Sequence, residues 1–193
     1  MIKSFTTHVL NEEKNTHMTH IEDQVIYGGV KGARDAILAL RSLRDMLAGN
    51  STKSVDVTVK WDGAPAVFVG KDPSDGKFFV AKKGVFNKNP KVYKSHADID
   101  DDTSGDLSTK LKAAFDALKS ASIKDVIQGD IMYVKDDLKK EKIDGQEYLT
   151  FHPNTIVYAV PPATPAAKEI ARAKIGIVWH TTYKGASFEE MKA

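Results

Sequence analysis

The chain of 193 residues is 41% hydrophobic and 28% charged, which is typical of a globular protein and unlike disordered, collagen-like or coiled-coil chains. It has no cysteine, which excludes disulfides, thiolate metal sites and cysteine nucleophiles. Its 28 basic and 26 acidic residues leave a formal charge of +2, so any basic binding surface must come from local clustering. No apolar run approaches the roughly 20 residues of a membrane-spanning helix, so we expect no membrane association.

The first half of the chain changes from a polar start to a helix and then to strands. Residues 1–29 are polar without a sustained period, and we interpret them as an N-terminal extension. Apolar residues recur at helical spacing from Val30 to Leu47, and Gly49 supplies a stop. Valines alternate with polar residues over 55–59, which predicts a strand that ends at Lys60. A hairpin follows, whose strands at 66–69 and 77–81 are joined by a turn at 72–76.

The second half mixes helices with further strands. We interpret the polar and acidic stretch 87–105 as a surface loop. Asp106 is a suitable cap for a helix that runs to Leu118, and Thr164-Pro165 is a favourable helix start. Three β-like runs cover residues 126–133, 155–160 and 175–183. This order predicts an α+β fold of antiparallel sheets with flanking helices, in a single domain that spans residues 30–193.

The end of the chain carries a helix-start signal with little sequence after it. Ser187-Phe188-Glu189-Glu190 has the spacing of a capping box, in which Ser187 and Glu190 satisfy backbone donors at a helix start. Only three residues follow. We therefore expect a domain that is incomplete at its C-terminus.

The segment Lys60-Trp61-Asp62-Gly63 is the strongest candidate for chemistry. A partly buried lysine can have its pKa lowered toward neutrality, which makes its amine a nucleophile. Gly63 allows close approach of the backbone to a ligand, and Asp62 can orient neighbouring groups. A simpler interpretation is a solvated strand end followed by an Asp-Gly turn.

These four residues resemble the K-x-D-G motif of ATP-dependent DNA and RNA ligases and mRNA capping enzymes. Three later segments resemble further elements of that covalent nucleotidyltransferase superfamily in the expected order: the lysines of Phe79-Val80-Ala81-Lys82-Lys83-Gly84, the Gly129-Asp130 pair of a strand, and the apolar strand Ile156-Val157-Tyr158-Ala159-Val160. The resemblance implies a ligase-type adenylation domain.

It also implies a role for each matching residue. Lys60 would be the nucleophile that forms a lysyl–nucleotide intermediate with ATP or GTP. Lys82 or Lys83 would contact phosphate, and Asp130 would hold a ribose hydroxyl or Mg²⁺. Tyr158, or alternatively Trp61, would stack on the base. The acceptor would be the 5′ phosphate end of a nucleic acid, either RNA or DNA. Each role has a structural alternative, because solvated lysines, a strand-end aspartate and a core tyrosine are all common.

Two later elements of that superfamily, a Glu-Gly segment and a closing lysine pair, have no match in this chain. Their usual place would follow the strand at 175–183, which again indicates a missing C-terminal part and leaves open whether this chain is active by itself. Most of the chain, from Thr16 to Tyr183, also resembles uncharacterised proteins of large tailed phages. That resemblance implies a cytoplasmic protein of an infected bacterial cell.

Two other functions compete with this hypothesis. His17 and His20, with Glu22 and Asp23, are metal-ligating residue types close together, which would suit a metal-dependent enzyme. His152 and His180 are further histidine candidates. Alternatively, the chain is a nucleic-acid-binding or virion-associated protein that keeps a ligase-like fold without catalysis. The lysines and aromatic residues of the segment 82–93 would then contact a phosphate backbone, or simply form a charged surface hairpin. The sequence does not indicate an oligomeric state.

Overall fold

The structure is a computed structural model that describes residues 20–50 and 61–193. The chain divides into two compact units, Met1–Val59 and Lys60–Ala193, and each is described by itself. Lys60 and the predicted strand at 55–59 lie outside the described residues. None of the helices in the two described ranges has the length and apolar character that crossing a bilayer demands.

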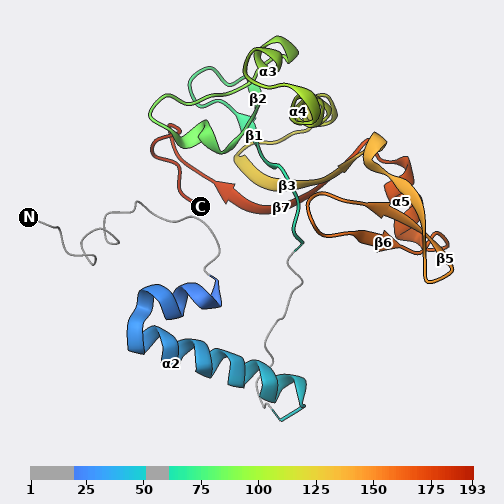
Figure 1. Ribbon diagram of the computed structural model, residues 1–193. Helices are drawn as coiled ribbons and strands as arrows, with labels where there is room; N and C mark the ends of the chain where they lie inside the picture. The colour runs from blue at the N-terminus through green and yellow to red at the C-terminus, as the bar shows by residue number, and fades with distance from the viewer. Residues whose placement is uncertain (1–19, 51–60) are drawn as a thin grey trace, which may run out of the picture. The chain divides into compact units, whose positions relative to one another are not determined.

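The described part of the first unit is the helix α2 (Ile21–Leu47), which confirms the predicted helix but begins at Ile21 rather than at Val30. Gly29 interrupts it with non-helical angles (φ 55°, ψ −144°), a conformation that glycine adopts without steric cost. The segment before this break packs closely on Gly32, where an added Cβ would lie 1.8 Å from the carbonyl oxygen of Gln24. α2 is therefore two helical segments joined at Gly29 (Figure 1).

A four-stranded antiparallel sheet forms the centre of the second unit, in the order β2-β1-β3-β7. Its strands are β1 (Ala66–Lys71), β2 (Phe78–Ala81), β3 (Val126–Val134) and β7 (Ile175–Tyr183). A second sheet has the order β4-β5-β6, from β4 (Lys139–Ile143), β5 (Gln146–Phe151) and β6 (Tyr158–Val160). The unit is thus α+β with antiparallel sheets and flanking helices, as predicted.

β1 is buried on both faces, which explains its continuous apolar run. Val67, Val69 and Ile131 belong to one core cluster, together with residues of α3 (His96–Asp102) and α4 (Gly105–Leu118). Both helices lie on this side of the sheet (Figure 1). Phe68 belongs to a second cluster on the other face, which includes Tyr183 of β7.

The residues after β7 pack against this second cluster. Lys184 and Lys192 form a β-bridge, and the ring of Phe188 meets that of Phe79 edge to face at 5.3 Å. The Ser187 hydroxyl accepts a hydrogen bond from the Glu190 N–H at 3.3 Å, but these residues form a turn and no helix. The predicted helix start at Ser187 is therefore wrong, because the chain turns back within a few residues and Lys192 pairs with Lys184.

A third core cluster joins the two sheets. Met132 and Tyr133 of β3 pack with Phe151 of β5, and Ile170 of α5 (Pro165–Arg172) packs against them. α5 begins as predicted, since Thr164 accepts a hydrogen bond from the backbone of Ala167 at 3.2 Å. In Figure 1, β3 and β7 extend as a long antiparallel pair from the first sheet toward the second.

The local structure departs from the sequence analysis in three places. The stretch 87–105 contains the helix α3, which Ser95 caps by accepting a hydrogen bond from the Asp98 N–H at 3.2 Å. The N-cap of α4 is Ser104, and Asp106 lies in its first turn. The hairpin of β4 and β5, which was not predicted, turns at Asp144-Gly145, where both residues have positive φ. These angles fit the two-residue turn that Asp-Gly favours.

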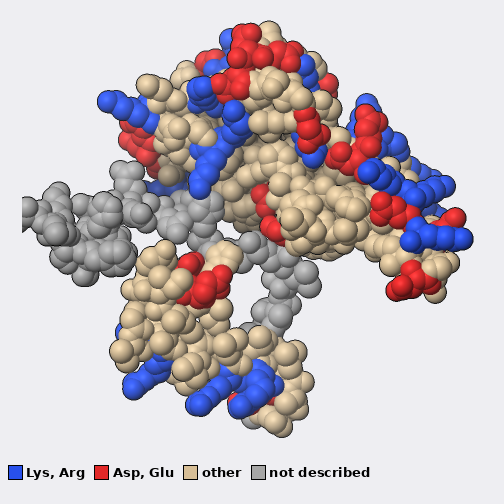
Figure 2. Space-filling view, in the orientation of Figure 1, with Lys and Arg blue, Asp and Glu red and all other residues tan. Residues whose placement is uncertain are grey.

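Asp102, the last residue of α3, forms ion pairs and a hydrogen bond with residues that follow β2. Its carboxylate accepts hydrogen bonds from the Lys91 ammonium and from the Tyr93 hydroxyl (2.6 Å), and it lies 2.9 Å from the Lys82 Nζ atom. These three partners, Lys91 first, lower the pKa of Asp102 below its ordinary value of 3.8. Figure 2 shows the acidic surface of α3 at the top of the molecule.

We predict that Asp102→Asn lowers the midpoint of urea unfolding at pH 7. Because the folded pKa of Asp102 is depressed, its contribution is present above the unfolded pKa of about 3.9 and is lost as pH falls through the folded value. The difference between wild type and variant should therefore shrink from pH 7 to about pH 2.5. A difference in midpoint that stays constant over this range would contradict the assigned ion pairs.

Candidate functional site

The segment after Lys60 runs alongside β3. The Ala64 N–H donates to the Ile131 carbonyl at 3.0 Å, and the Ile131 N–H donates to the Pro65 carbonyl at 3.0 Å. This pairing continues into the sheet, where Ala66 lies opposite Asp130. Trp61-Asp62-Gly63 therefore leads directly into the ladder that contains Gly129-Asp130.

Gly63 packs so closely on β3 that no side chain fits. An added Cβ would lie 2.8 Å from Met132 Sδ and 2.9 Å from both Asp130 Cβ and the Ile131 carbonyl oxygen. Real Cβ atoms do not approach backbone atoms this closely. The glycine thus brings the backbone of the predicted motif into contact with the predicted aspartate.

Asp62 is held from the other side by the connection between β5 and β6. The side chain of Asn154 donates to its carboxylate at 2.9 Å. The Tyr158 hydroxyl accepts from the Asp62 N–H at 2.9 Å and donates to the Asp62 carbonyl at 3.0 Å. Asn154 was not predicted as a site residue, because nothing in its local sequence links it to a segment so distant along the chain.

The two aromatic residues that the sequence offers for a base differ in accessibility. Tyr158 stacks with Phe151 (centroids 5.2 Å, 14° between planes) and with Trp61 (5.3 Å, 27°). Its ring and its hydroxyl are therefore both occupied within the protein. Trp61 is 47% exposed, so its ring is the more accessible of the two.

Asp130 lies next to a β-bulge. Gln128 pairs with Thr181 while Gly129 pairs with Trp179, which leaves His180 as the extra residue of β7. Its Nε2 atom lies 3.7 Å from Asp130 Oδ1. Bulges commonly redirect a side chain beside functional sites. The sequence identified His180 only as one histidine among several, since a bulge depends on the register between two strands.

Gly129 is required at this bulge for a steric reason. An added Cβ there would lie 2.6 Å from the Val178 carbonyl oxygen and 2.7 Å from the Trp179 ring. Glycine therefore lets β7 approach β3 beside Asp130. The predicted Gly129-Asp130 pair is thus a place of close strand contact, with the carboxylate directly after it.

The structure does not bring Lys82 to Asp130. Lys82 directly follows β2 and lies on the same face of the sheet as Val80, two residues earlier. Val80 packs in the same cluster as Ile131. Because neighbouring strand residues point to opposite faces, Asp130 lies on the other face of the sheet. The Lys82 ammonium group pairs with Asp102 at 2.9 Å and lies 5.9 Å from the centre of the Tyr93 ring.

Lys83 is exposed and begins the short 3-10 helix η1 (Lys83–Phe86). It follows β2 at the same end of the sheet as Ala66, because Ala81 lies opposite Phe68 in the ladder. Of the two lysines predicted to contact phosphate, Lys83 is the one without an acidic partner among the described residues.

The histidine candidates do not form a described metal site. His17 lies outside the described residues, and His20 precedes α2 with its ring 3.4 Å from Glu22. His152 lies 3.5 Å from Glu141 on the second sheet. Within residues 20–50 and 61–193, no group of three or more histidine and carboxylate side chains is arranged to hold a metal ion.

The chain belongs to a protein family described as a family of unknown function (DUF6267), whose profile matches residues 15–193. No curated protein and no solved structure shows a significant match to it.

We predict that Gly63→Ala lowers the free energy of unfolding by about 1–3 kcal/mol, as expected when a side chain is forced into a filled space. Gly84→Ala is the matched control, because an added Cβ there would meet its nearest atom at 3.5 Å. Urea unfolding of both variants measures the difference. Equal stabilities would show that residues 61–65 are not packed on β3.

Proposed function

We propose that this protein is a covalent nucleotidyltransferase with Lys60 as its nucleophile. The lysine amine would attack the α-phosphorus of ATP, forming a P–N bond as the bond to pyrophosphate breaks and the amine loses a proton. The nucleotide would then pass to the 5′ phosphate of a nucleic acid, which releases the lysine. Such an enzyme would act in the cytoplasm of an infected bacterial cell, as the resemblance to phage proteins implies.

The contact between Gly63 and Asp130 is the observation that carries this proposal. The segments 61–63 and 129–130 resemble motifs of the same superfamily in the expected order, and they are distant along the chain. An added Cβ at Gly63 would lie 2.9 Å from Asp130 Cβ, so the two segments touch.

The surrounding residues fit a nucleotide in part. Trp61 offers an accessible ring for a purine, and Asp130 is a carboxylate whose side chain is 17% exposed, suited to a ribose hydroxyl or Mg²⁺. When bound, Mg²⁺ would neutralise charge on the phosphates. Lys83 suits phosphate contact better than Lys82, whose amine is paired with Asp102.

The proposed function implies a more specific fold than α+β. A ligase-type adenylation domain would place the lysine at the end of a strand, with a carboxylate on a neighbouring strand of the same sheet. The pairing of residues 64–66 with β3 is consistent with that arrangement.

The proposal predicts a covalent adduct. Incubation with ATP labelled at the α-phosphate and Mg²⁺ should give a labelled band on a denaturing gel, which pyrophosphate should remove by reversal. Lys60→Ala should lose all label, because no P–N bond can form there. Asp130→Asn should label at least about 100-fold more slowly if it organises the reacting phosphate. The same assay with labelled GTP distinguishes the two nucleotides.

Three results would count against this function. Label that survives Lys60→Ala would identify another nucleophile. No adduct with either nucleotide, from folded protein, would favour a non-catalytic binding protein. Full activity of Asp130→Asn would exclude Asp130 from the reaction and leave the contact with Gly63 without a catalytic meaning.

A second prediction concerns the base. Trp61→Leu should weaken nucleotide binding by about 10-fold, as loss of one base–aromatic stack implies, while the maximal rate of adduct formation changes little. Trp179→Leu is the matched control, since Trp179 is 38% exposed and contacts Gly129 on the side of the sheet away from Asp130. A Trp61 variant with unchanged half-saturation for ATP would assign the base to another residue.

A further inference from the structure

Two adjoining cavities lie at the far end of β1 from Asp130. Ala66, opposite Asp130, begins β1, and Lys71 ends it about 17 Å away at roughly 3.4 Å per residue. The cavities measure about 320 and 350 Å³ and share Asp72 and Pro73 in their walls. Neither includes a residue of the site proposed above.

One cavity is lined by lysines from three separate elements. Lys71 ends β1, Lys124 precedes β3, and Lys184 follows β7. All three are exposed, and neither Lys71 nor Lys124 has a carboxylate partner among the described residues. Lys184 lies 3.9 Å from Asp125.

The carboxylates of this cavity do not cancel its positive charge. Asp72 is buried, and the Lys94 ammonium lies 2.7 Å from it while Ser74 donates two hydrogen bonds (2.8 and 2.6 Å). Burial opposes ionisation, but these partners still lower the pKa of Asp72 below its ordinary value. Its charge is therefore matched by a lysine outside the cavity, which leaves Asp125 as the other carboxylate among the lining residues.

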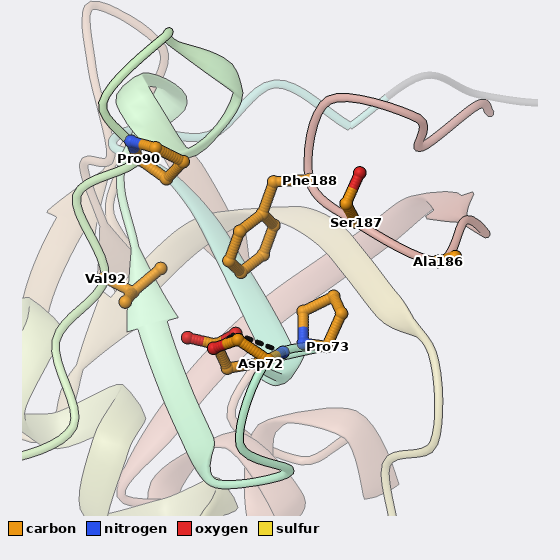
Figure 3. A pocket seen from close by; sticks show the side chains of 8 residues that line it. Asp72, Pro73, Pro90, Val92, Ala186, Ser187 and Phe188 are labelled. Carbon is orange, nitrogen blue, oxygen red and sulfur yellow. Dashed lines mark hydrogen bonds between the residues drawn. The ribbon is translucent and has the colours of Figure 1, made fainter.

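The other cavity is mainly apolar. Phe188, Pro73, Pro90 and Val92 form its walls, and Figure 3 shows the ring of Phe188 pointing down between Val92 and Pro73. Phe188 is only partly buried, so part of its ring faces the cavity. An aromatic ring beside prolines suits a flat, apolar group such as a nucleobase.

We propose that these two cavities together bind single-stranded nucleic acid, with phosphates at Lys71, Lys124 and Lys184 and a base against Phe188. A cationic hollow that adjoins an aromatic platform is the combination by which proteins hold single strands without reading their sequence. The choice of nucleic acid as partner rests on the proposed function, but the binding requires neither ATP nor Lys60.

This placement differs from the basic segment that the sequence indicates. In the segment 82–91, Lys82 and Lys91 share the single carboxylate of Asp102, while Lys83 and Lys88 have no acidic partner among the described residues. The lysines of the cavity are distant from one another along the chain and are brought together only by the fold.

The experiment measures binding of a fluorescein-labelled oligo(dT) strand by anisotropy across a salt series, without ATP or Mg²⁺, for wild type and for Lys60→Ala. The triple variant K71A/K124A/K184A should reduce the magnitude of the slope of log binding constant against log salt concentration by about 2. Each phosphate contact on a single strand contributes about 0.7 to that magnitude. The matched control is K139A/K140A/K142A, which removes the same charge from β4, where Figure 2 shows lysines at the right. Phe188→Leu, which keeps an apolar contact with Phe79, should weaken binding by roughly 5-fold or more.

Equal losses in the two triple variants would assign binding to net charge and overturn the proposal. So would an unchanged salt slope in K71A/K124A/K184A, or competition by inorganic phosphate alone as strong as by unlabelled strand. Loss of binding in Lys60→Ala would show that the nucleic acid binds at the site of the proposed chemistry and not at the cavities. Absence of an ATP adduct with retained, cavity-dependent binding would refute the proposed function and leave this surface standing.

Discussion

The close contact between the backbone of residues 63–66 and β3 is the constraint on which the second unit depends. Gly63 and Gly129 both lack a side chain where one would collide with a neighbouring strand. Gly63 lets the segment before β1 approach Asp130, and Gly129, which precedes Asp130 in β3, lets β7 approach from the other side. Asp130 therefore lies where β1, β3 and β7 approach one another closely.

The second sheet gives the same segment a second point of attachment. Asn154 and Tyr158 hold Asp62 through its side chain and its backbone, while Tyr158 also packs with Phe151 in the cluster that joins the sheets. The position of Trp61-Asp62 is thus set by both sheets rather than by a flexible turn. Because polar groups that are already bonded cost free energy to release, the segment should keep this geometry when a ligand arrives. Preorganisation of this kind is what positional catalysis requires.

Much of the fold follows from apolar periodicity, and the parts that do not have identifiable causes. The buried run of β1 and the stripe of α4 were predictable because burial on a sheet or helix face leaves a period in the sequence. α3 was missed because only Ile99 among its residues is buried, although Ser95 and Asp98 carry a cap signal. The hairpin of β4 and β5 was missed because β4 is mostly charged and exposed, so it leaves no apolar period in the sequence.

The candidate site was predictable to a similar degree. Asp62, Gly63 and Asp130 could be identified from short motifs, whereas Asn154 and His180 reach the site only through a loop and a bulge whose positions depend on tertiary contacts.

Charge shows why contiguous sequence is a poor guide to a binding surface. Lysines that cluster along the chain often meet acidic residues from elsewhere, as Lys82 and Lys91 meet Asp102 of α3. Conversely, Lys71, Lys124 and Lys184 carry no signal in sequence, since each stands at the end of a different strand or connection. The electrostatic potential that a polyanion experiences is the sum of all charges, including those of the ion-paired residues. The three lysines come together because the pairing of β1, β3 and β7 places these strand ends at the same end of the sheet. Asp130 lies opposite Ala66, at the other end of β1 from Lys71, so the length of that strand separates the lysines from the proposed site.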